Sequence, residues 1–72
     1  MKIISTTDIS REGSACYIYE SISLVEQFGI YAIIKHRKVA GHEDTVSVEL
    51  VFSSTDCGAA IKKYDSLGGI IK

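Results

Sequence analysis

The residues of this chain that most readily do chemistry are two cysteines and two histidines: Cys16, His36, His42 and Cys57. These are the side-chain types that bind zinc, but none of them stands in the close pairs that are usual at structural zinc sites. Free cysteines commonly pack as small buried hydrophobic residues. We therefore predict neither a metal ion nor a cofactor, and we interpret both cysteines as thiols of low reactivity.

A cysteine nucleophile is a second possibility. Cys57 lies at the start of a predicted helix, where a thiolate is stabilised, and His36 and Glu20 are candidate partners. Cys57 also falls on the apolar stripe of that helix, which favours simple packing. Glu20 and His36 are expected to be cross-strand neighbours, and a structural pair explains them without catalysis. A chain of 72 residues has little room for a pocket beside its core, so we predict that it is not an enzyme.

A basic cluster at residues 35–38 could bind phosphate. Together with Tyr17, Tyr19 and Tyr31 it is similar to the stacking and phosphate-binding surface of single-strand binders. Alternation along a strand, however, divides the cluster between both faces of a sheet. The formal net charge is −1, so the chain as a whole does not attract polyanions. Single-stranded nucleic-acid binding is therefore kept as the alternative function.

The length and the N-terminus favour one small domain in the cytoplasm. A domain of 72 residues buries only about 60% of the surface of its unfolded chain. Only Ile3 and Ile4 precede polar residues at the start, unlike the apolar core of a signal peptide. No apolar run approaches the ~20 residues of a membrane span. We predict a single domain over residues 1–72, reduced thiols and no membrane partner, with a structural disulfide as the minority interpretation.

These side chains must be positioned by a small sheet and one helix. Residues 15–25, 29–39 and 45–53 are β-rich, and residues 2–9 form a weaker strand. Apolar residues then recur at helical spacing over residues 55–67, after Thr55 or Ser54 as the N-cap and before two glycines. The predicted fold is α+β: an antiparallel meander of three to four strands with one C-terminal helix packed on one face.

The connection at residues 27–29 sets the register of the first hairpin. A three-residue loop commonly has glycine at its last position, which fits Gly29. This loop places Glu26 opposite Ile30 and Leu24 opposite Ala32. The even-numbered side chains of both strands then share one face.

The third strand follows the same parity. Its predicted register sets Lys35 opposite Glu49, where opposite charges meet, Ile34 opposite Leu50, and Ala32 opposite Phe52. The even-numbered face is then the core, and the third strand contributes to it through Val46, Val48, Leu50 and Phe52.

The odd-numbered face is half apolar and rich in tyrosine, and no second helix remains to cover it. Aromatic residues and arginine are enriched at the centres of protein interfaces. Scattered apolar residues on a solvated face are the alternative. Because these side chains adjoin in the predicted register, we favour an interface. The predicted interface residues are Tyr17, Tyr19, Tyr31, Ile33, Lys35, Arg37 and Val51.

The predicted function is therefore non-catalytic protein–protein interaction. The protein would act by forming a homodimer, or as a regulator or inhibitor of a larger protein. Anti-defence proteins of phages and mobile elements are one such class, by analogy with small proteins of similar design.

Three motifs lie in order along residues 19–67: Leu24-Val25-Glu26, Phe28-Gly29-Ile30 and Ser53-Ser54-Thr55-Asp56 before the helix. In this order they resemble a family of short uncharacterised proteins from clostridial-type bacteria. The chain departs from that family in having Phe28 where the family has tyrosine, and in lacking an acidic helix. The family has no assigned activity, so the resemblance implies a bacterial cytosolic origin and no mechanism.

Overall fold

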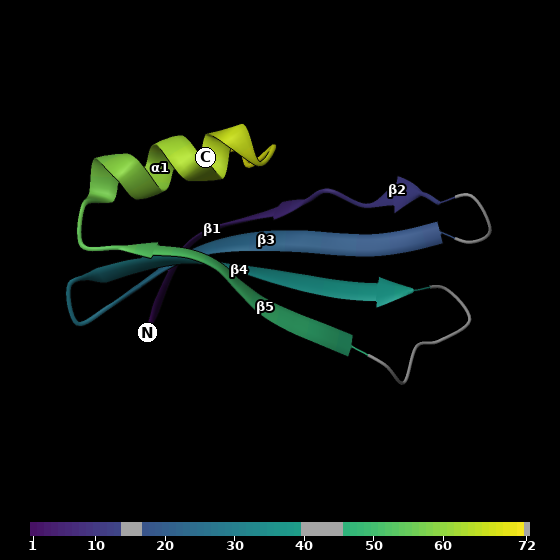
Figure 1. Ribbon diagram of the computed structural model, residues 1–72, viewed down its shortest axis with the longest axis horizontal. Helices are drawn as coiled ribbons and strands as arrows, with labels where there is room; N and C mark the ends of the chain where they lie inside the picture. The colour runs from purple at the N-terminus through teal and green to yellow at the C-terminus, as the bar shows by residue number, and fades with distance from the viewer. Residues whose placement is uncertain (14–16, 40–45, 72) are drawn as a thin grey trace.

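The computed structural model describes residues 1–13, 17–39 and 46–71. In this part of the chain, five strands and one helix follow one another: β1 (Lys2–Asp8), β2 (Arg11–Glu12), β3 (Tyr17–Gln27), β4 (Ile30–Val39), β5 (Val46–Ser54) and α1 (Cys57–Ser66). All strand pairs are antiparallel, in the order β1-β3-β4-β5, and the short β2 also pairs with β3. Figure 1 shows one sheet with α1 along one side. The predicted α+β meander with a C-terminal helix is confirmed.

A two-residue turn joins β3 to β4. Phe28 and Gly29 both have positive φ, 54° and 77°, as in the turns whose twist matches a hairpin. Gln27 consequently pairs with Ile30, and Leu24 pairs with Ile33. The predicted three-residue loop was wrong by one residue. Such a slip turns every side chain of one strand to the other face, so even-numbered residues of β3 share a face with odd-numbered residues of β4.

The predicted register between β4 and β5 is confirmed for Lys35 opposite Glu49 and for Ile34 opposite Leu50. Beyond this point Ile33 pairs with Phe52, which leaves Val51 as the extra residue of a β-bulge. The predicted pairing of Phe52 with Ala32 was therefore wrong. The bulge brings Phe52 to the same side of the sheet as Ile33.

The core lies between α1 and the sheet. Its buried members are Ile22, Leu24, Ile33, Ala60 and Tyr64, and the half-buried residues Ile4, Ile9, Tyr31, Val51, Phe52 and Leu67 pack against them. Val48 and Leu50, which were predicted for the core, are 63% and 62% exposed. They lie on the opposite side of the sheet because the β3–β4 register is shifted by one residue.

Both ends of α1 are capped, the first by a side chain and the second by backbone hydrogen bonds. Asp56, rather than Thr55 or Ser54, is the N-cap, and its Oδ1 accepts a hydrogen bond from the Gly58 amide at 3.0 Å. At the other end the Gly68 amide donates to the Asp65 carbonyl oxygen and the Gly69 amide to that of Tyr64. Gly68 has a φ of 91°, so the two glycines form a Schellman motif. The predicted stop at these glycines is confirmed.

Tyr64 attaches the helix to the sheet. Its hydroxyl donates to the Ile22 carbonyl oxygen at 3.2 Å and lies 2.7 Å from the Thr7 hydroxyl. The Thr7 hydroxyl oxygen also accepts a hydrogen bond from the Ile70 amide at 3.0 Å, and the Ser5 hydroxyl donates to the Ile70 carbonyl oxygen. The C-terminal tail therefore folds back toward β1, and together with Tyr64 it fixes α1 on one side of the sheet.

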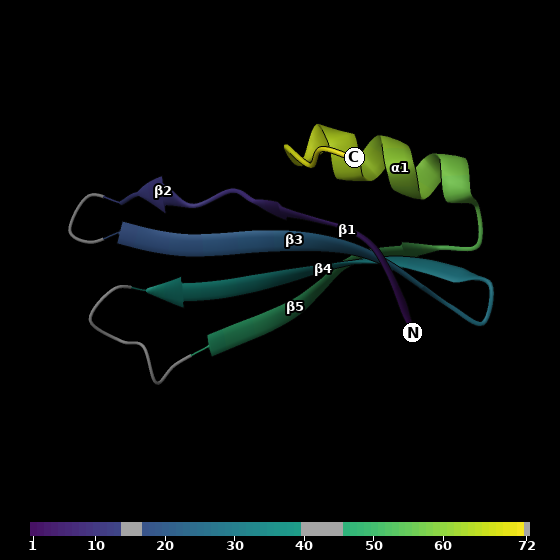
Figure 2. The ribbon, with the colours of Figure 1, turned by 180° about the vertical axis from the view of Figure 1, so that it is seen from behind.

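The helix is much shorter than the sheet. Ten helical residues span about 15 Å, whereas the eleven residues of β3 span about 36 Å. The molecule measures 39 × 21 × 18 Å, and its radius of gyration of 13.0 Å exceeds the ~11 Å expected for its length. Figures 1 and 2 show α1 along the half of the sheet near the β3–β4 turn. No helix within the described residues is long and apolar enough to cross a bilayer.

Candidate functional site

The sheet has two unlike sides. We call the side on which α1 packs the helix side, and the opposite side the open face. No element of the described part of the chain packs on the open face. Strand register and alternation assign to it Ile3, Thr6, Asp8, Glu12, Tyr17, Tyr19, Ser21, Ser23, Val25, Gln27, Ile30, Ala32, Ile34, His36, Lys38, Val48, Leu50 and Ser53.

The open face is apolar near the β3–β4 turn and along β5. A shallow hollow of about 300 Å³ is lined there by Met1, Val25, Gln27, Phe28, Ile30, Ala32 and Ile34. Leu50 of β5 pairs with Ile34 and continues the apolar surface sideways. Ile30, Val48 and Leu50 are 48%, 63% and 62% exposed. Contiguous apolar patches of this kind mark interaction sites in soluble proteins.

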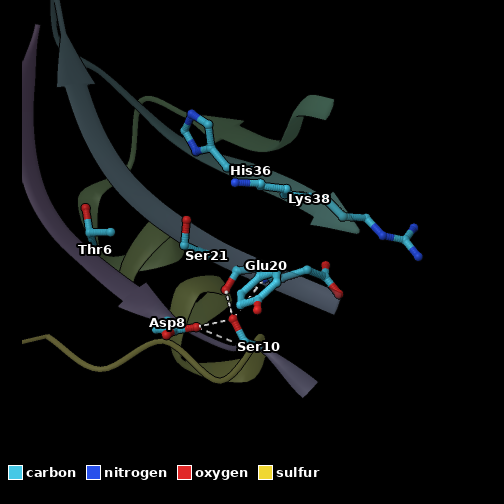
Figure 3. Close-up of a pocket in the computed structure, with 9 residues that line it drawn as sticks. Thr6, Asp8, Ser10, Glu20, Ser21, His36 and Lys38 are labelled. Atoms are coloured by element: carbon cyan, nitrogen blue, oxygen red, sulfur yellow. Dashed lines mark hydrogen bonds between the residues drawn. The ribbon is translucent and has the colours of Figure 1, made fainter. Parts of the chain in front are cut away.

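The other end of the open face is polar. A second open hollow, of about 510 Å³, is lined by Thr6, Asp8, Ser10, Tyr19, Ser21, His36 and Lys38, and it also borders Glu20 and Arg37, whose side chains belong to the helix side. In Figure 3, His36 and Lys38 extend from β4, while Asp8 and Ser10 meet on the far side of β3. Asp8 accepts hydrogen bonds from the Ser10 amide at 2.9 Å and from the Ser10 hydroxyl. These hydrogen bonds lower the pKa of Asp8 below its ordinary value and favour its ionised form. The bond from the Ser10 hydroxyl contributes most, and the bond from the Ser10 amide contributes less.

Asp8, Ser21 and His36 form a row across three strands, since Asp8 pairs with Ser21 and Ser21 with His36. These are the residue types of a serine-hydrolase triad, but the order differs. In a triad the histidine stands between the serine and the carboxylate, so that it accepts the serine proton while the carboxylate orients it. Here the serine stands in the middle, and the carboxylate is occupied by Ser10. The row therefore places no carboxylate where it could orient His36 as a base.

The seven residues predicted for the interface do not share one surface. Tyr17 and Tyr19 lie on the open face and are 39% and 48% exposed. Ile33 is fully buried under α1, and Tyr31 and Val51 pack against the same core. The one-residue shift between β3 and β4 is the cause, because it exchanges the two faces of β4.

Lys35 and Arg37, the two basic members of the predicted interface, also lie on the helix side. Arg37 pairs with Glu20 across the strands, and the Lys35 ammonium lies 3.6 Å from the Glu20 carboxylate. Arg11 of β2 forms a further ion pair with the same carboxylate, which is almost fully buried. The predicted pairing of Glu20 with His36 is wrong, because His36 pairs with Ser21. The observed neighbours of Glu20 are the three basic residues Arg11, Lys35 and Arg37. The division of the basic cluster between the two faces is confirmed.

The predicted zinc and nucleophile residues are not brought together where the structure describes them. His36 lies on the open face, whereas Cys57 begins α1 on the helix side. Cys16 and His42 lie outside the described residues. Within the described ranges, no group of three or more potential ligands could hold a metal ion.

Cys57 is a free, half-buried thiol that lies beside Tyr31. The hydrogen bond between the Cys57 thiol and the Tyr31 hydroxyl is the main cause that raises the pKa of Tyr31 above its ordinary value. The negative charge of the Cys57 thiolate is the second cause. Both residues lie where α1 meets the sheet. The contact is therefore part of the helix packing.

The residues that sequence reasoning missed are the apolar ones of the open face: Ile30, Ala32, Ile34, Val48 and Leu50. The predicted three-residue loop placed them on the same face as Ile22 and Leu24, and so assigned them to the core. Charge could have corrected the register, because the observed pairing sets Glu20 opposite Arg37 and within 3.6 Å of the Lys35 ammonium. The predicted pairing offered Glu20 only His36.

No protein-family model matches the chain, and no curated protein or solved structure shows significant similarity to it. The fold and the open face together define an α+β protein. Its helix covers one half of one side of the sheet, and the opposite side of the sheet is partly apolar.

Proposed function

We propose that this protein is non-catalytic and acts by protein contact through its open face. The observation that supports this most is the exposure of Val48 and Leu50, 63% and 62%, beside Ile34 on a sheet surface without a covering layer in the described chain. Each Å² of apolar surface that a partner removes from water contributes about 25 cal/mol. A continuous surface of this kind favours association.

A tyrosine pair at the far end of the open face also supports a contact surface. The rings of Tyr17 and Tyr19 lie 4.7 Å apart in an edge-to-face arrangement with an interplanar angle of 62°. Both rings are partly exposed. Tyrosine is enriched among the residues that dominate binding energy at interfaces, since its ring is rigid and its hydroxyl is polar.

We further propose that this contact takes place in the cytoplasm, either as self-association or as regulation of a larger protein. The free thiol of Cys57 suits a reducing compartment.

The test is recovery of partners by tagged full-length chain in the organism that encodes it. Leu50→Lys places a charge within the apolar surface, beside Ile34. Ile61→Lys makes the same change on α1, where Ile61 is 41% exposed and not part of the core. We expect Ile61→Lys to recover the partners of the wild type and Leu50→Lys to lose them. Equal recovery by both variants would contradict the proposed function.

Nucleic-acid binding is the second candidate, and one observation favours it: Lys38 lies directly opposite Tyr19 on the open face. A base could stack on the ring while the ammonium contacts phosphate. Lys35 and Arg37 cannot join them, because they lie on the helix side. If the second candidate is correct, a fluorescent single-stranded oligonucleotide will bind with a steep loss of affinity in salt, and Lys38→Gln will weaken it. We expect no such binding.

A further inference from the structure

We propose that the occupant of the open face is a second copy of this chain. Two sheets would stack through their open faces, with one helix on each outer side. This inference rests on the proposed function, which assigns the open face to protein contact, and it names the partner. Stacked sheets bury their inner faces against each other at a spacing of about 10 Å, which suits side chains of this size.

The exposed area is that of one half of a dimer interface. Ile3, Ile30, Val48 and Leu50 are between 48% and 63% exposed, and the two tyrosines are 39% and 48% exposed. Phe28 borders the surface and is 91% exposed. A fully exposed aromatic side chain offers about 150–250 Å² and an aliphatic one lies at or below the low end of this range, so these residues together offer roughly 800 Å². A stable interface takes about 800 Å² from each partner, which is close to the total for these residues.

The chemistry of the surface fits a homodimer. The exposed residues near the β3–β4 turn and along β5 are aliphatic, and homodimer interfaces are more apolar than those between unlike proteins. Within the described open face, the acidic and basic residues are Asp8, Glu12, His36 and Lys38. Asp8, His36 and Lys38 lie in the polar hollow, and Glu12 lies opposite Tyr17, so none of them is in the aliphatic part of the face. Asp8 is opposite in sign to Lys38, so a two-fold arrangement can match the acid of one copy with the base of the other.

The sheet edges are less suited to self-association than the open face. On the edge strand β5, the bulge at Val51 interrupts the regular row of backbone donors and acceptors. The edge strand β1 has its own register shift between Ile3 and Ser5. Bulges of this kind protect edge strands from pairing with another chain.

The test is sedimentation equilibrium of the purified full chain from about 1 µM to about 500 µM. We expect a dimer whose dissociation constant lies in the micromolar range or below. Leu50→Lys should raise that constant at least 100-fold and keep a dispersed amide NMR spectrum, whereas Ile61→Lys should sediment as the wild type does. Leu50→Ser, which adds no charge, should weaken the dimer less and covers the case in which the lysine variant does not fold.

A wild type that stays monomeric at about 500 µM overturns the inference, as does a dimer unaffected by Leu50→Lys. The two proposals fail separately. A monomeric wild type that recovers another protein, and loses it on Leu50→Lys, contradicts the second copy and leaves the contact function standing. A dimer abolished by Leu50→Lys supports the inference even where no other protein is recovered.

Discussion

Leu24 of β3 lies directly opposite Ile33 of β4, and both side chains are fully buried beneath α1. This pair decides which side of the sheet is the core. Because Ile33 faces the helix, its neighbour Ile34 faces away, and so does Leu50, which pairs with Ile34. The open face of the molecule is thus a direct consequence of the two-residue turn at Phe28 and Gly29.

Ile33→Ala should lower the free energy of unfolding by about 2–5 kcal/mol, because it leaves a cavity among Leu24, Ala60 and Tyr64. Urea titration measures the loss, which should be the same at every protein concentration since the cavity lies within one chain.

Leu50→Ala is the matched comparison on the open face. Its effect should depend on protein concentration, because Leu50 is exposed in the single chain and buried only in the proposed dimer. A large loss for Leu50→Ala that is independent of concentration, with a small one for Ile33→Ala, would show that the two faces are exchanged.

Glu20→Gln should destabilise the protein by about 1–3 kcal/mol. The substitution keeps the shape but removes a buried charge that Arg11 and Lys35 contact. Both bases are partly exposed and can return to water, which limits the loss. Glu49→Gln, an exposed residue opposite Lys35, should change stability by less than about 0.5 kcal/mol. Equal midpoints in urea for both variants would refute the role assigned to Glu20.

Gly69→Ala should be destabilising by about 1–3 kcal/mol, because a Cβ there would lie 2.4 Å from the ring of Tyr64. Gly58→Ala, in the first turn of α1, should instead stabilise by about 0.5–1 kcal/mol, since alanine is the better helix former and its Cβ meets only the Asp56 side chain. Thermal denaturation of the two variants measures the opposite signs. A stabilising Gly69→Ala would mean that the tail does not pack on Tyr64.

The pKa of Asp8 should lie below its ordinary value of 3.8, and Ser10→Ala should raise it. A carboxyl whose pKa is lower in the folded state stabilises the fold above its unfolded pKa, and this contribution is lost as the pH falls through the folded value. The side-chain carbon resonance of Asp8, followed by NMR through an acid titration, reports the pKa. An unchanged value in Ser10→Ala would show that the serine hydroxyl does not bind the carboxylate.

Much of the fold could be predicted from the sequence, because strand alternation, helical spacing and the glycine pair are local signals. The register between β4 and β5 was also predictable, since Lys35 and Glu49 carry opposite charges. The register between β3 and β4 was not. A two-residue turn with positive φ at both positions usually contains asparagine, aspartate or glycine first, and Phe28 is a poor residue for that conformation.

The candidate site was predictable only in part for the same reason. Tyr17 and Tyr19 were placed correctly because the parity of β3 follows from its own alternation. The parity of β4 depends on the turn, so the prediction placed Ile34 in the core and Ile33 at the interface, the reverse of the structure. The bulge at Val51 is likewise a property of the folded sheet, and it is what returns Phe52 to the core after the exposed Leu50.

The stacking of two open faces is tested most directly by isotope-filtered NMR on a sample that mixes labelled and unlabelled chains. Contacts that cross between chains should connect the methyl groups of Val48 and Leu50 with those of Ile34 and Ile30 in the other copy. Intermolecular contacts that instead involve α1, or that connect only the backbones of two β5 strands, would contradict the account.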